Sequence, residues 1–155
     1  MAIMTNEINL MEIFKDLGKI CKTPEVCGYC AERACLIGYA RNVTADCRKA
    51  KRTGVPNGFA NIPPSDIRGG YDEYNVLHAI AHLLVQCRSC KEDHYDNCLI
   101  NVVRSCLEVI EFGEEQKFNG NVIQYLMQIS EISPTKADII REEYTSHKEK
   151  VDELQ

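Results

Sequence analysis

The sequence predicts an all-α protein, a single compact domain of about five to seven helices over residues 1–150, followed by a charged end at 151–155. The length of 155 residues is close to the commonest size of one domain and is enough to enclose a sizeable core. Apolar residues recur at the three- and four-residue spacing of helices, and no stretch shows the alternation typical of strands. Hydrophobic residues make up 45% and charged residues 26%, which is typical of a globular protein rather than a disordered one.

The N-terminal third should contain two helices. Periodicity from Asn6 predicts the first, whose buried stripe would comprise Ile8, Met11, Ile13, Phe14, Leu17 and Ile20. Thr23 followed by Pro24 has the pattern of an N-cap and a first-turn proline, so a second helix is expected from about Pro24 to Tyr39. The stretch "TADCRKAKR", residues 44–52, should be a short helix or turn.

A long loop should follow near residues 53–70, where "TGVPNGFANIPPSDIRGG" concentrates glycine, proline and asparagine. Loops of this length are uncommon in compact domains and are often functional, so the segment is a candidate ligand-binding lid on the surface. The alternative is a plain surface connection.

The second half returns to helical spacing in four segments. In "YDEYNVLHAIAHLLVQC" the inward residues should be Tyr74, Leu77, Ala81 and Leu84, and in "NCLINVVRSCLEVIEF" they should be Leu99, Val102, Val103, Cys106 and Ile110, ending at Gly113. A shorter helix is expected over 121–130. Ser133 and Pro134 should start the last helix, whose charged final third is expected to project or fray.

Nine cysteines make the chain cysteine-rich. We find no run of roughly 18 apolar residues and no signal-peptide pattern, so we expect a cytoplasmic protein without a membrane segment. In that reducing compartment, disulfides are rare, and cysteines serve as metal ligands, reactive thiols or core residues.

The stretch "QCRSCKEDHYDNC", residues 86–98, predicts a zinc site. Cys87, Cys90, His94 and Cys98 have the spacing C-x2-C-x3-H-x3-C, a complete set of four ligands within one segment. The spacing resembles the C-x2-C-x4-H-x4-C pattern of retroviral-type zinc knuckles. Each of the last two gaps is one residue shorter here, so the resemblance assigns no family.

A second ligand set would join Cys87 and Cys90 to the other CxxC pair, Cys27 and Cys30, and close a site of four thiolates. Either set needs the helix to break near residues 88–97, since an unbroken helix would spread the ligands along one stripe. Asp96 or Asn97 is the expected N-cap of the next helix.

His78 and His82 form an HxxxH pair on one helical face, which could bind a metal. The glutamate of the HExxH protease motif is absent, and the pair points away from Cys87 and Cys90. We therefore interpret them as two partly buried, hydrogen-bonded histidines.

An iron-sulfur cluster is the alternative cofactor. Its four sulfur ligands would be Cys27, Cys30, Cys35 and Cys47, although their spacing differs from the common ferredoxin runs.

A basic cluster precedes the long loop and comprises Arg41, Arg48, Lys49, Lys51 and Arg52. The net charge of −5 and the absence of interleaved aromatic residues disfavour nucleic acid, so a solvated basic face is expected. A nucleotide or other small phosphorylated ligand at residues 48–72 is the alternative.

The function that the sequence favours is a small intracellular, zinc-stabilised helical module that binds a protein partner or regulates one. No paired acid and base residues point to catalysis, so a non-enzymatic role is preferred. The two alternatives are an iron-sulfur or thiol redox protein, and a protein that binds, sequesters or acts on a small phosphorylated ligand.

Overall fold

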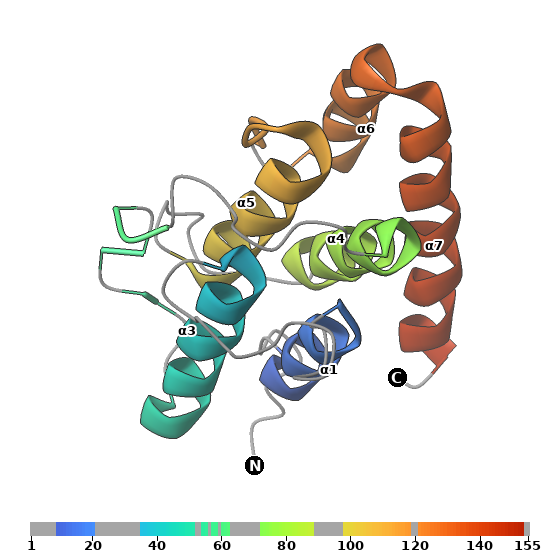
Figure 1. Ribbon diagram of the computed structural model, residues 1–155. Helices are drawn as coiled ribbons and strands as arrows, with labels where there is room; N and C mark the ends of the chain where they lie inside the picture. The colour runs from blue at the N-terminus through green and yellow to red at the C-terminus, as the bar shows by residue number, and fades with distance from the viewer. Residues whose placement is uncertain are drawn as a thin grey trace.

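The computed structural model describes residues 9–20, 35–51, 54–55, 57–58, 60–62, 72–88, 98–118 and 121–153. Within these ranges the chain forms six helices and no strand, which confirms the all-α prediction (Figure 1). The helices are α1 (Leu10–Ile20), α3 (Leu36–Ala50), α4 (Glu73–Arg88), α5 (Leu99–Phe112), α6 (Val122–Ile132) and α7 (Pro134–Glu153). None of the helices in this part of the chain has the length and apolar character needed to cross a bilayer.

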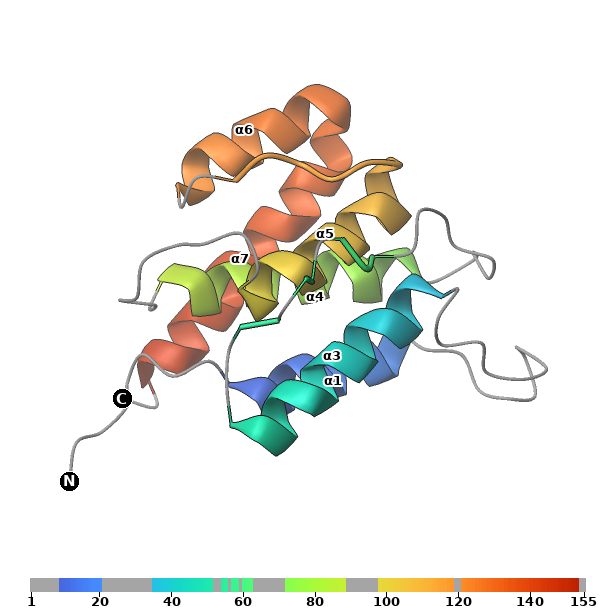
Figure 2. The ribbon, with the colours of Figure 1, turned by 90° about the vertical axis from the view of Figure 1, so that its left-hand side faces the viewer.

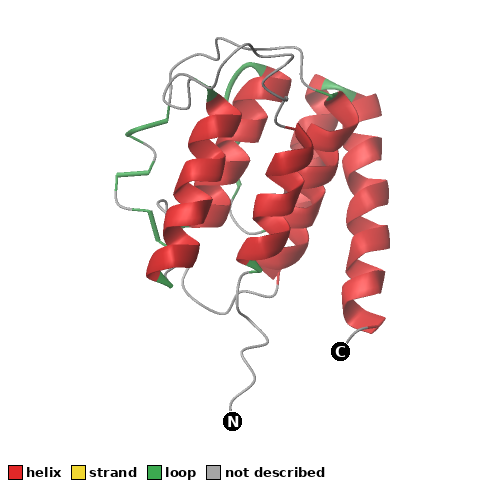
Figure 3. Ribbon diagram, turned by 60° about the horizontal axis from the view of Figure 1, so that its bottom comes forward, coloured by secondary structure: helices red, strands yellow, loops and turns green. Residues whose placement is uncertain are grey.

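Four helices surround the core. Contacts between α1 and α3, α3 and α5, α5 and α4, and α4 and α1 close a ring, so each of these helices has two neighbours in it. Helix α7 packs on the outer side of α4, and α6 packs on α7 (Figures 1 and 3). The interior is filled by side chains with no exposed surface, among them Leu36, Ile37, Leu77, Leu84, Leu99 and Leu107.

Helix α1 buries part of its predicted stripe. Asn9 caps it by accepting a hydrogen bond from the Glu12 amide at 3.0 Å. Ile13, Leu17 and Ile20 are buried as expected. Met11 is 42% exposed, so its assignment to the core was wrong.

The predicted helix from Pro24 to Tyr39 is wrong at its C-terminal end. Cys35 has extended backbone angles, φ −116° and ψ 125°, and its thiol accepts a hydrogen bond from the Gly38 amide as the N-cap of α3. From there one helix continues to Ala50, because buried Val43, Thr44 and Cys47 extend the same inward stripe. Residues 44–50 are therefore the end of a long helix rather than a separate short one, and 21–34 lie outside the described residues.

Part of the predicted loop packs tightly on the bundle. Val55 is 7% exposed, and the Tyr39 hydroxyl donates a 2.6 Å hydrogen bond to the buried Gly58 carbonyl. A Cβ at Gly58 would lie 2.7 Å from Val102, so a side chain there would force a shift. The expectation of a surface lid is therefore wrong for Val55 and Gly58, while residues 63–70 lie outside the described part of the loop.

Helices α4 and α5 follow the predicted periodicity. Leu77, Ala81 and Leu84 are fully buried, but Tyr74 is 62% exposed and does not belong to the core. Gly113, with φ 85°, ends α5 at the predicted residue because glycine enters this left-handed region without strain.

A single residue joins α6 to α7 (Figure 2). The Ser133 amide donates to the Ile129 carbonyl at the end of α6, and its hydroxyl accepts from the Lys136 amide at the start of α7. This confirms the predicted start at Ser133 and Pro134. The predicted fraying is wrong, because α7 continues as a helix to Glu153.

Candidate metal centre

Three helices present polar side chains to one another at a spacing of four residues. This spacing places side chains on one helical face, one above the next. We call the resulting group the His–carboxylate cluster; it comprises Glu12 and Asp16 from α1, His78 and His82 from α4, and Glu143 and His147 from α7.

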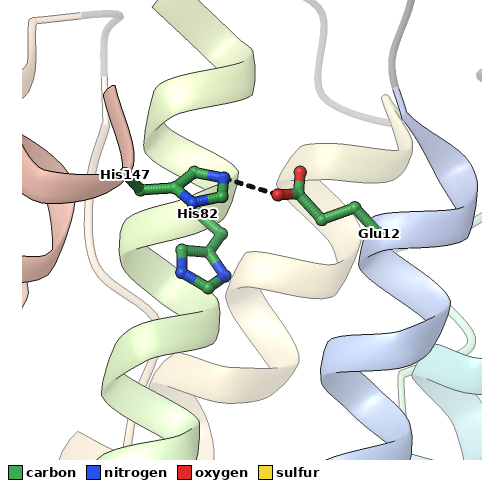
Figure 4. Close-up of side chains that lie close together, drawn as sticks. All are labelled: Glu12, His82 and His147. Carbon is green, nitrogen blue, oxygen red and sulfur yellow. Dashed lines mark ion pairs between the residues drawn. The ribbon is translucent and has the colours of Figure 1, made fainter. Parts of the chain in front are cut away.

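Within this cluster, Glu12, His82 and His147 could together hold a metal ion (Figure 4). One potential ligand atom from each lies within 4.8 Å of the other two, and all three side chains are partly buried. Because each comes from a different helix, an ion bound here would connect α1, α4 and α7.

His82 bridges two carboxylates. Its Nδ1 lies 2.7 Å from Asp16 Oδ2, and its Nε2 lies 2.6 Å from Glu143 Oε2. Burial of the ring lowers the pKa of His82, but the hydrogen bonds to Asp16 and Glu143 and their negative charges outweigh it, so the pKa is raised above its ordinary value. His82 is therefore protonated more readily than an ordinary histidine, and the doubly protonated ring can donate both hydrogen bonds.

Glu12 is held in place from α4. Gln86 Nε2 donates to Glu12 Oε2 at 2.7 Å, and Gln86 Oε1 accepts from the Asn9 amide at 2.6 Å. The other oxygen, Glu12 Oε1, faces His147. The carboxylate is thus oriented to offer one oxygen as a ligand.

His147 lacks such support. Its Nε2 lies 2.5 Å from Glu12 Oε1, but the contact does not have hydrogen-bond geometry, and this buried nitrogen has no hydrogen-bond partner among the described residues. The ring stacks on His82, with centroids 4.0 Å apart and planes at 28°. His147 Nε2 is therefore buried beside Glu12 and the ring of His82 without forming a hydrogen bond to either.

These residue types fit a transition-metal ion. Two imidazoles and one carboxylate are a known zinc ligand set that leaves a fourth position open. An ion would occupy one ring nitrogen of His82. The other nitrogen would still donate a hydrogen bond to its carboxylate, Asp16 at Nδ1 or Glu143 at Nε2, as is common around metal sites. Ligand atoms around tetrahedral zinc are about 3.3 Å apart. An ion would therefore widen the contact between Glu12 and His147 while drawing the more distant atoms inward.

A small hollow adjoins the cluster. It is lined by Asp16, His82 and Gln86 on its polar side and by apolar residues that include Leu17 and Leu107. The hollow has room for about one water molecule. Of the three candidate ligands, only His82 lines it.

Only two residues of the predicted cysteine zinc sets are described. Cys87 is half-buried against the core in the last turn of α4, and Cys98 is buried at the N-cap of α5. Cys27, Cys30, Cys90 and His94 lie outside the described residues, so both ligand sets stay predictions.

Cys98 has extended angles, φ −63° and ψ 139°, so α5 is a separate helix from α4, which is described to Arg88. The predicted break at 88–97 otherwise lies outside the described residues. The predicted N-cap, Asp96 or Asn97, is wrong, since Cys98 occupies that position without a side-chain hydrogen bond.

The predicted iron-sulfur ligand set conflicts with α3. Cys35 is the N-cap of this helix, and Cys47 lies in its last turn. Twelve residues of helix separate them by about 18 Å along the axis, which is too far for two ligands of one cluster. A cluster held by Cys35 and Cys47 together is therefore excluded.

The interpretation of the histidine pair is confirmed for His82, which is partly buried and hydrogen-bonded. His78 is 39% exposed and lies 4.0 Å from Glu143. Sequence reasoning missed Glu12, Asp16, Glu143 and His147. The available signal was the repeated four-residue spacing of acids and histidines in three segments.

Two residues of the basic cluster have a local packing role. The guanidinium groups of Arg41 and Arg48 lie 5.1 and 5.7 Å from the centre of the Phe14 ring. This is the distance range of cation–π attraction, so both charges help to join α3 to α1.

The chain matches no protein-family model, no curated protein and no solved structure. A functional assignment must therefore start from the chemistry of the site itself.

Proposed function

We propose that this protein is a small, non-catalytic helical module whose fold is fastened by zinc bound to Glu12, His82 and His147. The observation that carries the proposal is that one ligand atom from each of three helices lies within 4.8 Å of the other two. Such an ion would join segments distant in sequence, so its binding energy would contribute to folding.

The ligand types favour zinc or a similar transition metal over magnesium or calcium. The latter two prefer a shell of oxygen atoms, whereas two of the three ligands here are imidazoles. The buried Nε2 of His147 adds support, because an ion would give this nitrogen the partner that Glu12 does not provide in hydrogen-bond geometry.

A binding or regulatory role is proposed over catalysis. The hollow beside His82 has room for about one water molecule, and its remaining walls are apolar. A protein partner in the cytoplasm remains part of the proposal, as the sequence suggested.

A thiolate zinc site is a second proposal, on the evidence of Cys87 and Cys98. These two cysteines lie at the end of α4 and at the start of α5, where a metal would fasten the connection between two core helices. With Cys90 and His94 they would form the local ligand set. The other set joins Cys87 and Cys90 to Cys27 and Cys30 and does not include Cys98. The two sites use different residues and can both exist in one chain.

The test is metal binding by full-length protein purified without added metal. Isothermal titration with zinc should show a site that is lost in His147→Ala and kept in His78→Ala, a matched histidine change on the exposed edge of the cluster. Removal of supporting residues typically weakens metal binding about 10- to 100-fold, so loss of a ligand should exceed that.

Cobalt(II) in place of zinc separates the two proposed sites. Thiolate ligands give intense sulfur-to-cobalt charge-transfer bands, which an oxygen and nitrogen site lacks. We expect Cys87→Ser to remove only the charge-transfer component. If His147→Ala binds zinc and cobalt as the parent protein does, the His–carboxylate cluster is not a metal site.

A further inference from the structure

We infer that the metal ion controls the docking of the C-terminal half of α7, residues 141–153, while the first half stays attached without it. This inference rests on the proposed zinc site and adds a regulatory consequence to it. It follows from a difference between the two halves of α7: the first half has buried side chains, whereas the second half is held mainly by polar contacts.

The first half of α7 is anchored by buried apolar side chains and by a partly buried ion pair. Ala137 is 5% exposed and Ile140 is fully buried. Lys136 Nζ lies 2.8 Å from Glu111 Oε2 and donates to the Glu111 carbonyl at 3.0 Å. The contacts of Lys136 join the start of α7 to α5, and they do not involve the residues proposed to bind the ion.

The second half has no fully buried side chain. Tyr144 is its partly buried hydrophobic residue packed against the core, and most other positions are exposed. Burial of apolar surface therefore contributes little to holding residues 141–153 in place.

Polar contacts hold this half instead. Glu143 Oε2 lies 2.6 Å from His82 Nε2, and His147 Nε2 lies 2.5 Å from Glu12 Oε1. The loss of hydration of these partly buried groups offsets much of the attraction between them, so their net contribution to docking is modest. Without an ion, the second half of α7 should open much more often than the first.

Zinc would change this balance. Coordination by His147 on α7 with His82 on α4 and Glu12 on α1 would replace the contact between Glu12 and His147 with metal–ligand bonds. Opening the second half would then require breaking the bond to His147. A ligand present at 100 times its dissociation constant shifts such an equilibrium about 100-fold.

Hydrogen-exchange mass spectrometry of the full chain, with zinc or with a chelator, tests the inference. We expect zinc to slow exchange in peptides from 141–153 by at least about tenfold more than in peptides from 134–140. His147→Ala should abolish the slowing. Ser146→Ala, an exposed change on the same helix, should preserve it.

Each contrary outcome has a separate meaning when zinc binding is measured by calorimetry on the same samples. Zinc that binds without slowing exchange in 141–153 overturns the inference and leaves the metal site standing. Slowing in 134–140 as large as that in 141–153 also overturns it, since the ion would then not act selectively on the second half of α7. No zinc binding at the cluster overturns the inference together with the proposed site.

Discussion

Two polar clusters in this protein differ in how completely their members bond with one another. One is the His–carboxylate cluster between α1, α4 and α7. The other, which we call the buried network, joins α5 to α6 and comprises Asn101, Arg104, Glu108, Gln116 and Tyr125. Both gather charge between helices, so their contrast separates a structural role from a ligand-binding one.

The buried network is closed. Glu108, fully buried, accepts hydrogen bonds from Arg104 at 3.1 Å, from the Gln116 amide at 2.8 Å and from the Tyr125 hydroxyl at 2.5 Å. Arg104 also donates to Asn101 at 2.8 Å. Burial raises the pKa of Glu108, while the charge and hydrogen bonds of these partners lower it, and the net shift is upward.

The His–carboxylate cluster is not closed. His147 keeps a buried nitrogen without a hydrogen-bond partner in the described structure, and its ring stacks on a histidine that is protonated more readily than an ordinary one. Buried polar groups are nearly always satisfied in native proteins. The His–carboxylate cluster differs from the buried network in this respect, and the difference supports the proposal that it binds a further group.

The largest effect should come from breaking the buried network. Glu108→Ala leaves Arg104 buried without its partner, so we expect a loss of about 3–5 kcal/mol in the free energy of unfolding. Urea denaturation measures it. Glu114→Ala, an exposed change nearby, is the control and should stay within about 0.5 kcal/mol. A loss below about 1 kcal/mol for Glu108→Ala would show that the network contributes little.

A smaller effect should appear when the pH of metal-free protein is varied. Because the pKa of His82 is raised on folding, protonation of His82 favours the folded state below pH about 6.5, and this contribution is lost as the pH rises through the higher folded-state value. For Glu143, burial raises the pKa, but the hydrogen bond from His82 and the nearby histidine charges lower it more. Its contribution is present above the ordinary value and lost as the pH falls through the folded-state value.

Metal-free protein should therefore gain most from this pair between about pH 4.5 and 6.5. The measurement is the midpoint of urea unfolding across pH 4 to 8, compared with His82→Gln. The parent protein should lose stability relative to the variant above this range. Parallel curves would mean that His82 does not carry the dependence.

The smallest effect should come from His78→Ala. His78 is 39% exposed and its nearest carboxylate oxygen is 4.0 Å away, so its removal should change the free energy of unfolding by no more than about 0.5 kcal/mol. Thermal unfolding of metal-free protein checks this. A loss as large as that of His82→Gln would show that the cluster extends to its exposed edge.

Much of the fold was predictable from local signals. Gly113 and Ser133 ended and started helices at the expected residues, because their roles depend on backbone conformation and short-range hydrogen bonds. The start of α3 was not predictable in this way. Cysteine is an unusual N-cap, and the apolar spacing around Cys35 gave no sign of the extended residue.

The candidate site was predictable only in part. The HxxxH spacing drew attention to His82, but its interpretation depended on partners that lie 61 and 66 residues away in sequence. Glu143 and His147 were hidden in a segment rich in charge, which resembles a helix surrounded by solvent. Which of those charges face α4 is decided by tertiary packing, since the pattern of α7 is only weakly amphipathic.

The contacts of Lys136 with Glu111 help to set the direction of the α7 axis, and this direction determines where His147 lies. His147 is eleven residues beyond Lys136, a distance of about 16 Å along the axis. A tilt of only about 3–4° about that anchor would move the His147 backbone by about 1 Å. Metal ligands tolerate errors of only about 0.2 Å in bond length, so side-chain adjustment has a narrow range. If the proposed site binds zinc, substitutions at Glu111 or Lys136, far from the candidate ligands, should weaken the affinity by changing the direction of the helix axis.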